Sequence, residues 1–178
     1  WEKLYSERVC AAYWREHGLE TRIARFHNIY GPFGTYEGGR EKAPAALCRK
    51  AAEAFDGGEL EVWGDGQQTR SFCYIDDCLE GIHRLMRSDH REPLNIGSEE
   101  MVTIDQLADM AIALSGKNLT RSYRPAKPQG VRGRSSDNTL VRKVLGWSPQ
   151  TSLWEGMQKT YPWISFQVRL KRERMGPR

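Results

Sequence analysis

The sequence predicts an α/β protein, in which helices pack on a sheet of paired strands. Helix-like and strand-like segments alternate along the 178 residues without an internal repeat, which favours layered α/β architecture over a helical bundle or a β-sandwich. The composition is that of a folded chain with one or two lobes, since 39% of the residues are apolar and 28% are charged. No run approaches the roughly 20 apolar residues that a membrane-spanning helix requires.

Apolar residues at three- and four-residue spacing predict six helices. Gly18 ends the first helix, Pro44 fits the first turn of the second, and Thr103 is the expected N-cap of the fourth. We interpret the pair Asp76 and Asp77 as capping the third helix rather than as catalytic carboxylates, because adjacent helical residues do not face each other. The predicted helices span residues 1–17, 43–55, 75–87, 104–112, 138–145 and 153–170.

Segments of β-branched and aromatic residues between turn signals predict the strands. Two of them flank the turn GDGQ, which predicts a hairpin, or two strands that meet at a ligand. The aromatic residues of the last helix favour core packing or contact between lobes: they are Trp154, Tyr161, Trp163 and Phe166. The predicted strands span residues 21–31, 60–63, 68–74, 93–98 and part of 121–134.

Charge and cysteine content narrow the partners and the compartment. The net charge is +4 and most basic residues are scattered singly, which suits a small anionic ligand better than nucleic acid. The spacing of the four cysteines matches neither a zinc ribbon nor a redox pair, so we expect reduced structural thiols, no metal site and a cytoplasmic protein without a membrane partner. These cysteines are Cys10, Cys48, Cys73 and Cys78.

Several motifs, in one order, resemble the C-terminal half of the extended short-chain dehydrogenase family, the NAD-dependent nucleotide-sugar epimerases and dehydratases. WEKL, NIYGP, RSFCYIDD, NIGS and LGW are general to that family, whereas GGREKAPAA and GVRGRSSDN resemble its GDP-mannose 3,5-epimerase branch. The resemblance spans residue 2 to about residue 165. It implies NAD as cofactor, a GDP-sugar as substrate, and a homodimer when the protein is full length.

The resemblance also implies a division of the chain, which we expect to be one partial epimerase/dehydratase unit over residues 1–178. Late Rossmann elements are expected at about 1–35 and 68–98, and a mainly substrate-binding part at about 36–67 and 99–178. The Gly-x-Gly-x-x-Gly fingerprint of a dinucleotide-binding unit is missing from the sequence. Because residue 1 already lies in a predicted helix, we expect the first half of the unit to lie outside this chain.

The cofactor residues implied by the resemblance are Lys3, Phe26 and His27. Lys3 matches the Lys of a Tyr-x-x-x-Lys motif whose Tyr would precede residue 1; such a Lys binds the nicotinamide ribose and lowers the pKa of the Tyr. Phe26 and His27 end a predicted strand, where ligands collect in open α/β sheets. Taken alone, Lys3 would be an exposed charge and His27 a core or edge histidine.

The implied reaction requires acid/base groups on both faces of a sugar ring. A sugar C–H becomes acidic only beside a ketone, so NAD must first oxidise C4, after which protons at C3 and C5 can be exchanged. Lys42 is the candidate for one such group. Its implied partner, a Cys of the N-terminal half, is not in this chain. The implied catalytic residues are therefore Lys3 and Lys42.

A diphosphate requires cations and oriented donors, which Lys50, Arg70 and Arg134 match. The implied substrate-binding residues are Asn28, Glu41, Lys42, Ala43, Lys50, Gln68, Thr69, Arg70 and Arg134. The predicted function is conversion of GDP-mannose to GDP-L-galactose. Two alternatives stay open: another NDP-sugar 4-epimerase or 4,6-dehydratase, and a non-catalytic fragment that binds a sugar nucleotide. We expect this portion alone to be inactive and marginally stable.

Overall fold

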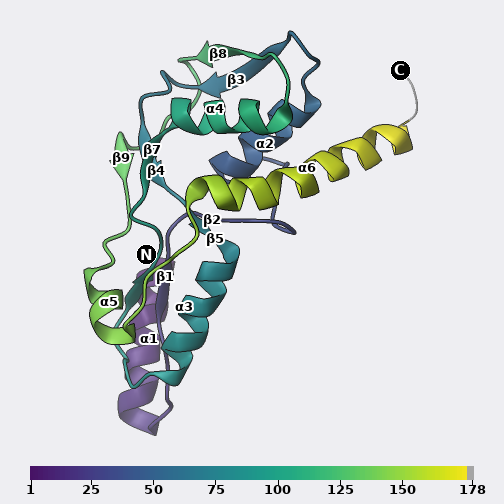
Figure 1. Ribbon diagram of the computed structural model, residues 1–178. Helices are drawn as coiled ribbons and strands as arrows, with labels where there is room; N and C mark the ends of the chain where they lie inside the picture. Colours follow the sequence, from purple (N-terminus) through teal and green to yellow (C-terminus); the bar gives the residue numbers. More distant parts are fainter. Residues whose placement is uncertain (176–178) are drawn as a thin grey trace.

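The computed structural model describes residues 1–175 and shows an α/β fold with two lobes (Figure 1), which confirms the predicted class. The helices are α1 (Glu2–His17), α2 (Ala43–Glu53), α3 (Ile75–Arg87), α4 (Ile104–Ser115), α5 (Thr139–Leu145) and α6 (Leu153–Met175). The strands are β1 (Ala24–Phe26), β2 (Ile29–Tyr30), β3 (Glu59–Trp63), β4 (Thr69–Ser71), β5 (Cys73–Tyr74), β6 (Leu94–Ile96), β7 (Met101–Thr103), β8 (Thr120–Arg124) and β9 (Gly133–Arg134).

The smaller lobe is built on the parallel pair of β1 and β6, with Phe26 opposite Ile96. Helices α3 and α5 cover this pair, and the fully buried Leu94 and Ile96 form its core with Val141 of α5. Val141 comes from the part of the chain that we expected to be mainly substrate-binding. Helix α1 lies beside the pair without burying any of its own residues.

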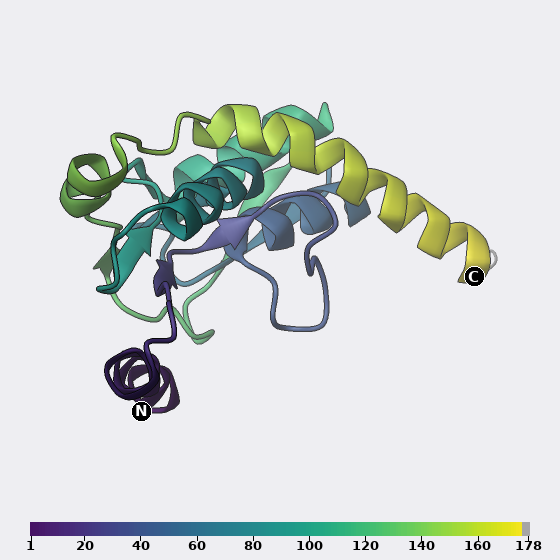
Figure 2. The same ribbon diagram turned by 90° about the horizontal axis from the view of Figure 1, so that it is seen from below.

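The larger lobe contains helices α2, α4 and α6 packed around a continuous apolar core. Its interior includes the fully buried Leu60 of β3, Leu107 of α4, and Met157 and Ile164 of α6. Strand β3 pairs in parallel with β8, while β4 pairs with β7 antiparallel and with β9 in parallel. Figure 2 shows α6 projecting away from the body of the molecule, at the opposite side from α1. Within residues 1–175, no helix has the length and apolar character to cross a bilayer.

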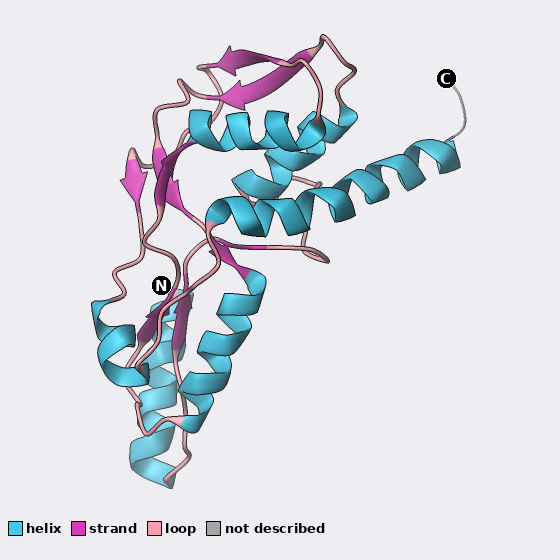
Figure 3. Cartoon of the chain, viewed as in Figure 1, coloured by secondary structure: helices cyan, strands magenta, loops and turns pink. Residues whose placement is uncertain are grey.

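The strand predictions need several corrections, and Figure 3 shows the strands as short, separate ladders. The expected strand 68–74 is divided into β4, which pairs with β7 and β9, and β5, which pairs with β2. The expected strand 21–31 breaks at Asn28, whose backbone is left-handed (φ 46°), so that β1 pairs with β6 and β2 with β5. The expected hairpin is also wrong, because β3 and β4 pair with other strands. Gly64 and Gly66 turn the chain toward α4, where the Gly66 carbonyl accepts a hydrogen bond from the Asp105 amide (2.9 Å).

The helix ends mostly follow the sequence signals. Gly18 ends α1 in the left-handed region, and Thr103 forms a capping box with Gln106. The acidic pair lies in the first turn of α3 as expected, but no side chain caps this helix. Asp77 instead accepts hydrogen bonds from the amides of Gln150 (3.1 Å) and Thr151 (2.9 Å). Its carboxylate therefore fixes the loop between α5 and α6.

Residue packing also differs from expectation along α6. Tyr161 and Trp163 pack against the larger core as expected, but Trp154 and Phe166 are exposed. The expectation of unpaired structural thiols is confirmed, because the four cysteines are free and three of them are buried. Burial raises the pKa of Cys48 and of Cys73 to about 12, so both remain protonated thiols at neutral pH.

Candidate active site

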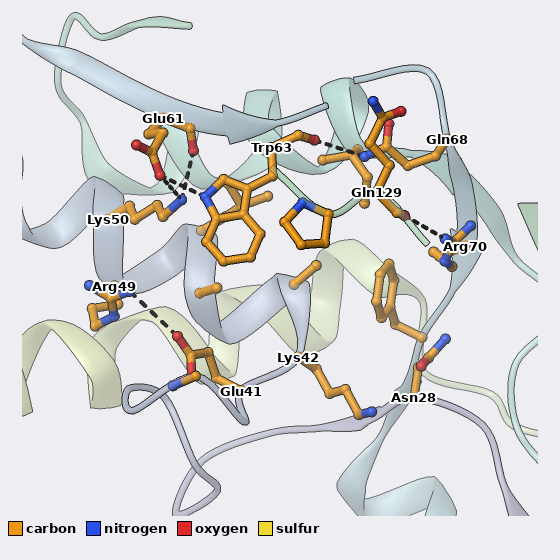
Figure 4. Close-up of a pocket in the computed structure, with 17 residues that line it drawn as sticks. Asn28, Glu41, Lys42, Arg49, Lys50, Glu61, Trp63, Gln68, Arg70 and Gln129 are labelled. Atoms are coloured by element: carbon orange, nitrogen blue, oxygen red, sulfur yellow. Dashed lines mark hydrogen bonds and ion pairs between the residues drawn. The ribbon is translucent and has the colours of Figure 1, made fainter. Parts of the chain in front are cut away.

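A cavity of about 300 Å³ opens in the larger lobe beside the first turns of α2 (Figure 4). The ends of β3 and β4 form one wall, and the loops around residues 39–42 and 128–129 complete it. The cavity brings together seven of the residues singled out by the sequence: Asn28, Glu41, Lys42, Ala43, Lys50, Gln68 and Arg70. Segments far apart in the chain therefore meet at one place.

Five predicted residues lie outside the lining of this cavity. Thr69 and Arg134 are near it, because Thr69 precedes Arg70 on β4 and Arg134 stands opposite Arg70 on β9. Lys3 lies on the exposed α1, and Phe26 and His27 lie at the end of β1 in the smaller lobe. The expected cofactor residues thus lie outside the cavity lining, although His27 directly precedes Asn28, which is part of that lining.

The first turn of α2 lies at the cavity and has no side-chain cap. Lys42 is the N-cap residue, with an extended backbone (φ −78°, ψ 155°) and no side-chain cap. Pro44 lacks an amide hydrogen, so the Ala43 and Ala45 amides are the first free donors at the positive end of the helix. In Figure 4 the Lys42 side chain extends toward Asn28. An anion or a reactive carbon bound here would meet an ammonium group and a helix N-terminus together.

Glu41 and Lys50 are both engaged by neighbouring side chains. Glu41 accepts a hydrogen bond from the Gly39 amide (2.7 Å) and lies 3.5 Å from Arg49, which fixes the loop before α2. The Lys50 ammonium lies 3.0 Å from the Glu61 carboxylate and 5.2 Å from the centre of the Trp63 ring. Hydrogen bonds from Lys50 and Trp63 lower the pKa of Glu61. Lys50 is therefore partly neutralised, unlike Lys42.

Gln68 is the buried polar residue of the cavity wall. Its side chain is only 5% exposed, and its Nε2 donates to the Trp63 carbonyl (2.8 Å). Its Oε1 is buried without a hydrogen-bond partner among residues 1–175. Because an unpaired buried acceptor costs free energy, this oxygen favours a ligand that donates a hydrogen bond.

Arg70 directs its guanidinium group to backbone carbonyls. Nη1 donates to the Thr69 carbonyl (2.7 Å), and Nη2 donates to the carbonyls of Gln129 (3.1 Å) and Val131. Burial and the nearby Arg134 lower the pKa of Arg70. No carboxylate within residues 1–175 pairs with Arg70, so its charge remains available to a bound anion.

At the other expected site, Phe26 and His27 end β1. Phe26 is 54% exposed, which leaves an aromatic surface open beside the strand end. Burial lowers the pKa of His27, and its hydrogen bond with Asn95 opposes this. The nearby positive charge of Arg134 also lowers the pKa of His27, which favours the neutral ring. An open apolar surface next to a neutral ring fits a planar nicotinamide.

The sequence reasoning missed Trp63, Glu61 and Gln129 of the cavity lining. Trp63 had a usable signal, because it is an aromatic residue at a strand end directly before a glycine turn. Glu61 lies between two buried residues of β3, and this alternation predicts only an exposed strand position. Gln129 lies in an irregular loop, where no periodic pattern could have placed it.

Comparisons with known proteins identify the family of the chain and support its fold. The sequence profile of the NAD dependent epimerase/dehydratase family matches residues 1–97. GDP-mannose 3,5-epimerase of Arabidopsis thaliana is 54% identical over 167 residues, which cover 94% of this chain and 44% of that protein. UDP-glucose 4-epimerase of Thermotoga maritima, solved with UDP-glucose, superposes with a TM-score of 0.82 at 29% identity, over 93% of this chain and 52% of that one.

A third similar protein was solved with the cofactor. UDP-glucuronic acid 4-epimerase of Bacillus cereus, in complex with NAD, has a TM-score of 0.75 at 28% identity, over 90% of this chain and 48% of that one. The chain thus spans about half the length of the proteins that it matches.

Proposed function

Because the chain belongs to the NAD dependent epimerase/dehydratase family, we propose that the full protein converts GDP-mannose to GDP-L-galactose by epimerisation at C3 and C5. The observation that carries the proposal is the cavity beside α2, which unites seven of the residues implied for such a substrate, including Lys42 at an uncapped helix N-terminus. The 54% identity to the Arabidopsis thaliana enzyme extends over that same region and supports this substrate above other nucleotide sugars.

Binding of the substrate divides among three kinds of group. The Ala43 amide and the Arg70 guanidinium supply donors for the diphosphate. The unpaired Gln68 Oε1 accepts a hydrogen bond from the base or the ribose, either of which carries suitable donors. Asn28 and Lys42 then lie beside the sugar, at the side of the cavity where Figure 4 places them.

Lys42 provides the proton exchange in this proposal. When bound, NAD supplies a reversible hydride acceptor for C4 of the sugar, and Lys3, Phe26 and His27 are the residues of this chain that would hold it. With a ketone at C4, the neighbouring C–H bonds become acidic. Lys42 Nζ takes or returns one proton on its face of the ring, and a group of the N-terminal portion acts on the opposite face.

We also propose a cytoplasmic homodimer for the full protein. Helix α1 buries none of its residues and exposes Leu4, Tyr5 and Trp14, which suits a helix that packs against a second copy. The free and mostly buried cysteines of the described chain suit a reducing compartment. Light scattering of the full protein would measure a dimer mass, and a monomer at micromolar concentration would contradict the proposed assembly.

Isotope exchange tests the proposed reaction most directly. The full protein is incubated with GDP-mannose and NAD in deuterated water, and the sugar is followed by NMR. We expect deuterium at C3 and C5, together with GDP-L-galactose or its 5-epimer. NAD binding without deuterium at either carbon would reject the 3,5-epimerase and favour another nucleotide-sugar enzyme or a binding protein.

A further inference from the structure

A strap of eight residues, 125–132, connects β8 to β9 (Figure 3). It contains no helix or strand, and Pro128 and Gln129 from it line the cavity. Lys127 Nζ lies 5.7 Å from the centre of the Trp63 ring, so the strap also covers the indole. The strap thus forms part of the wall of the site that holds the proposed substrate.

Few contacts tie the middle of the strap to the rest of the protein. The Lys127 amide bonds to Arg124 and the Gln129 side chain to Pro125, and both are local contacts. The end of the strap is tied by the Thr69 amide, which donates to the Arg132 carbonyl (2.9 Å), and by an exposed ion pair between Arg132 and Asp65 (2.7 Å). Across the middle, the described hydrogen bonds to the body come from one group, the Arg70 guanidinium, which holds the Gln129 and Val131 carbonyls.

Two glycines permit this close approach. Gly130 has a left-handed backbone (φ 69°), and a Cβ there would lie 3.3 Å from Arg70 Nη2. A Cβ at Gly64 would lie 2.6 Å from Gln129 Cγ, so the bare backbone at Gly64 leaves room for the strap side chain. Glycines in both the strap and the body therefore allow the strap to lie directly against the body, the arrangement that we call the closed position.

Arg70 keeps donors for a second partner while it holds the strap. A guanidinium has five N–H donors, and three are used by the carbonyls of Thr69, Gln129 and Val131. The Nε hydrogen and one Nη1 hydrogen remain, and the charge is not balanced by a carboxylate within residues 1–175. A phosphate oxygen bound to these two donors would stabilise the Arg70 guanidinium in the orientation in which it holds the strap.

We propose that Arg70 is a positioning residue that latches the strap over the cavity and couples closure to binding of the nucleotide diphosphate. The coupling rests on the proposed function, whereas the latch in the free protein does not. The expected behaviour is a strap that is partly closed without ligand and more fully closed when an anionic oxygen occupies the remaining Arg70 donors.

The latch is tested by native-state proteolysis of the full protein. Thermolysin cleaves before large apolar residues, and Val131 is exposed, so cleavage between Gly130 and Val131 reports strap opening. Arg70→Lys keeps the positive charge but loses the planar guanidinium that holds both carbonyls. We expect about tenfold faster cleavage at this bond, which corresponds to the loss of one charge-assisted hydrogen bond. Gly130→Ala should act in the same direction from the strap side.

The controls separate latching from general stability and from charge. Arg132→Gln removes only an exposed ion pair and should change the cleavage rate less than about twofold. Cleavage at an unchanged rate in both Arg70→Lys and Gly130→Ala, with an unchanged urea midpoint, would overturn the latch.

The coupling is tested with GDP as the probe. GDP should slow cleavage of the wild-type strap, and it should fail to do so in Arg70→Lys even at concentrations that saturate binding. Protection of the Arg70→Lys strap equal to that of the wild type would reject the coupling. Absence of GDP binding to the wild type would instead reject the proposed function and leave the free-protein result on the latch intact.

Discussion

The two ends of α2 are treated in opposite ways by the rest of the protein. At the C-terminal end, Lys117 Nζ donates to the carbonyls of Ala51 (2.9 Å), Ala52 (2.9 Å) and Ala54 (2.6 Å). Arg172 of α6 adds a hydrogen bond to the carbonyl of Glu53, next to them. At the N-terminal end, no side chain caps the helix, and its first residues line the cavity.

This difference separates stability from function along 11 residues. Two cations satisfy carbonyls at the negative end of the helix, where they lower the free energy of the folded state. The positive end keeps its amides free, although α4 shows that the same lobe can build a complete capping box. An uncapped end costs stability, and its position at the cavity is consistent with the binding role that we propose for it.

The largest expected effect is at the open end. Lys42→Met should reduce deuterium incorporation at C3 and C5 by roughly 10²- to 10⁴-fold, the usual contribution of a general acid or base. GDP binding should persist, because the α2 amides and Arg70 are untouched. Arg40→Met is the matched control, since it removes a neighbouring exposed charge of the same loop that does not line the cavity. Full exchange in Lys42→Met would remove this residue from the mechanism.

The next effect is at the closed end. Lys117→Met leaves carbonyls of α2 without their cation, and we expect the free energy of unfolding to fall by about 2 kcal/mol. Urea denaturation measures it. Lys143→Met, an exposed lysine on α5, should change stability by less than about 0.5 kcal/mol. Equal effects of both substitutions would show that the carbonyl contacts of Lys117 contribute nothing beyond its charge.

The sequence predicted the local features of this comparison better than the distant ones. Pro44, the Ala-rich segment and the loop before it were enough to place the open end of α2. The closed end depends on Lys117, which is 63 to 66 residues away from its acceptors and carries no local signal. Such contacts arise only once α2 and α4 pack together.

The site shows the same limit. The resemblance in motifs selected residues that converge on the cavity, although the chain itself gives no distance between Asn28, Lys42 and Gln68. The resemblance assigned Arg70 to ligand binding but gave no sign that Arg70 also binds backbone carbonyls of the strap. Those carbonyls lie about 60 residues away in an irregular loop. The broken strand at Asn28 was missed since only φ reveals a left-handed Asn in an otherwise strand-like run.

A smaller effect is expected for Lys42→Ser, which should raise the stability of the protein while it abolishes the proposed activity. Lys42 already has the extended backbone of an N-cap, so Lys42→Ser would place a hydroxyl where it can accept from the first free amides. We expect a gain of about 1 kcal/mol in unfolding free energy together with loss of isotope exchange. Thr103→Ala, which removes the existing cap of α4, should lose about 1 kcal/mol. Destabilisation by Lys42→Ser would contradict the view that this end is left open at a cost.

The smallest effect concerns the ion pair between Lys50 and Glu61. Lys50 lies in the last turn of α2, and it lines the cavity. Hydrogen bonds from Lys50 and Trp63 lower the pKa of Glu61 below its ordinary value of 4.5. A carboxyl whose pKa is lower in the folded state stabilises the protein above its unfolded pKa and loses that contribution as the pH falls through the folded pKa.

The Glu61 side chain is 38% exposed, so screening limits the contribution of this pair to about 0.5 kcal/mol. Glu61→Gln should therefore be less stable than the wild type at pH 7 and equally stable near pH 3, as urea denaturation at a series of pH values would show. Glu53→Gln is a matched control on α2, because it removes a carboxylate paired with Arg49 away from Lys50. A difference for Glu61→Gln that stays constant down to pH 3 would mean that lost packing, and not the ion pair with Lys50, accounts for it.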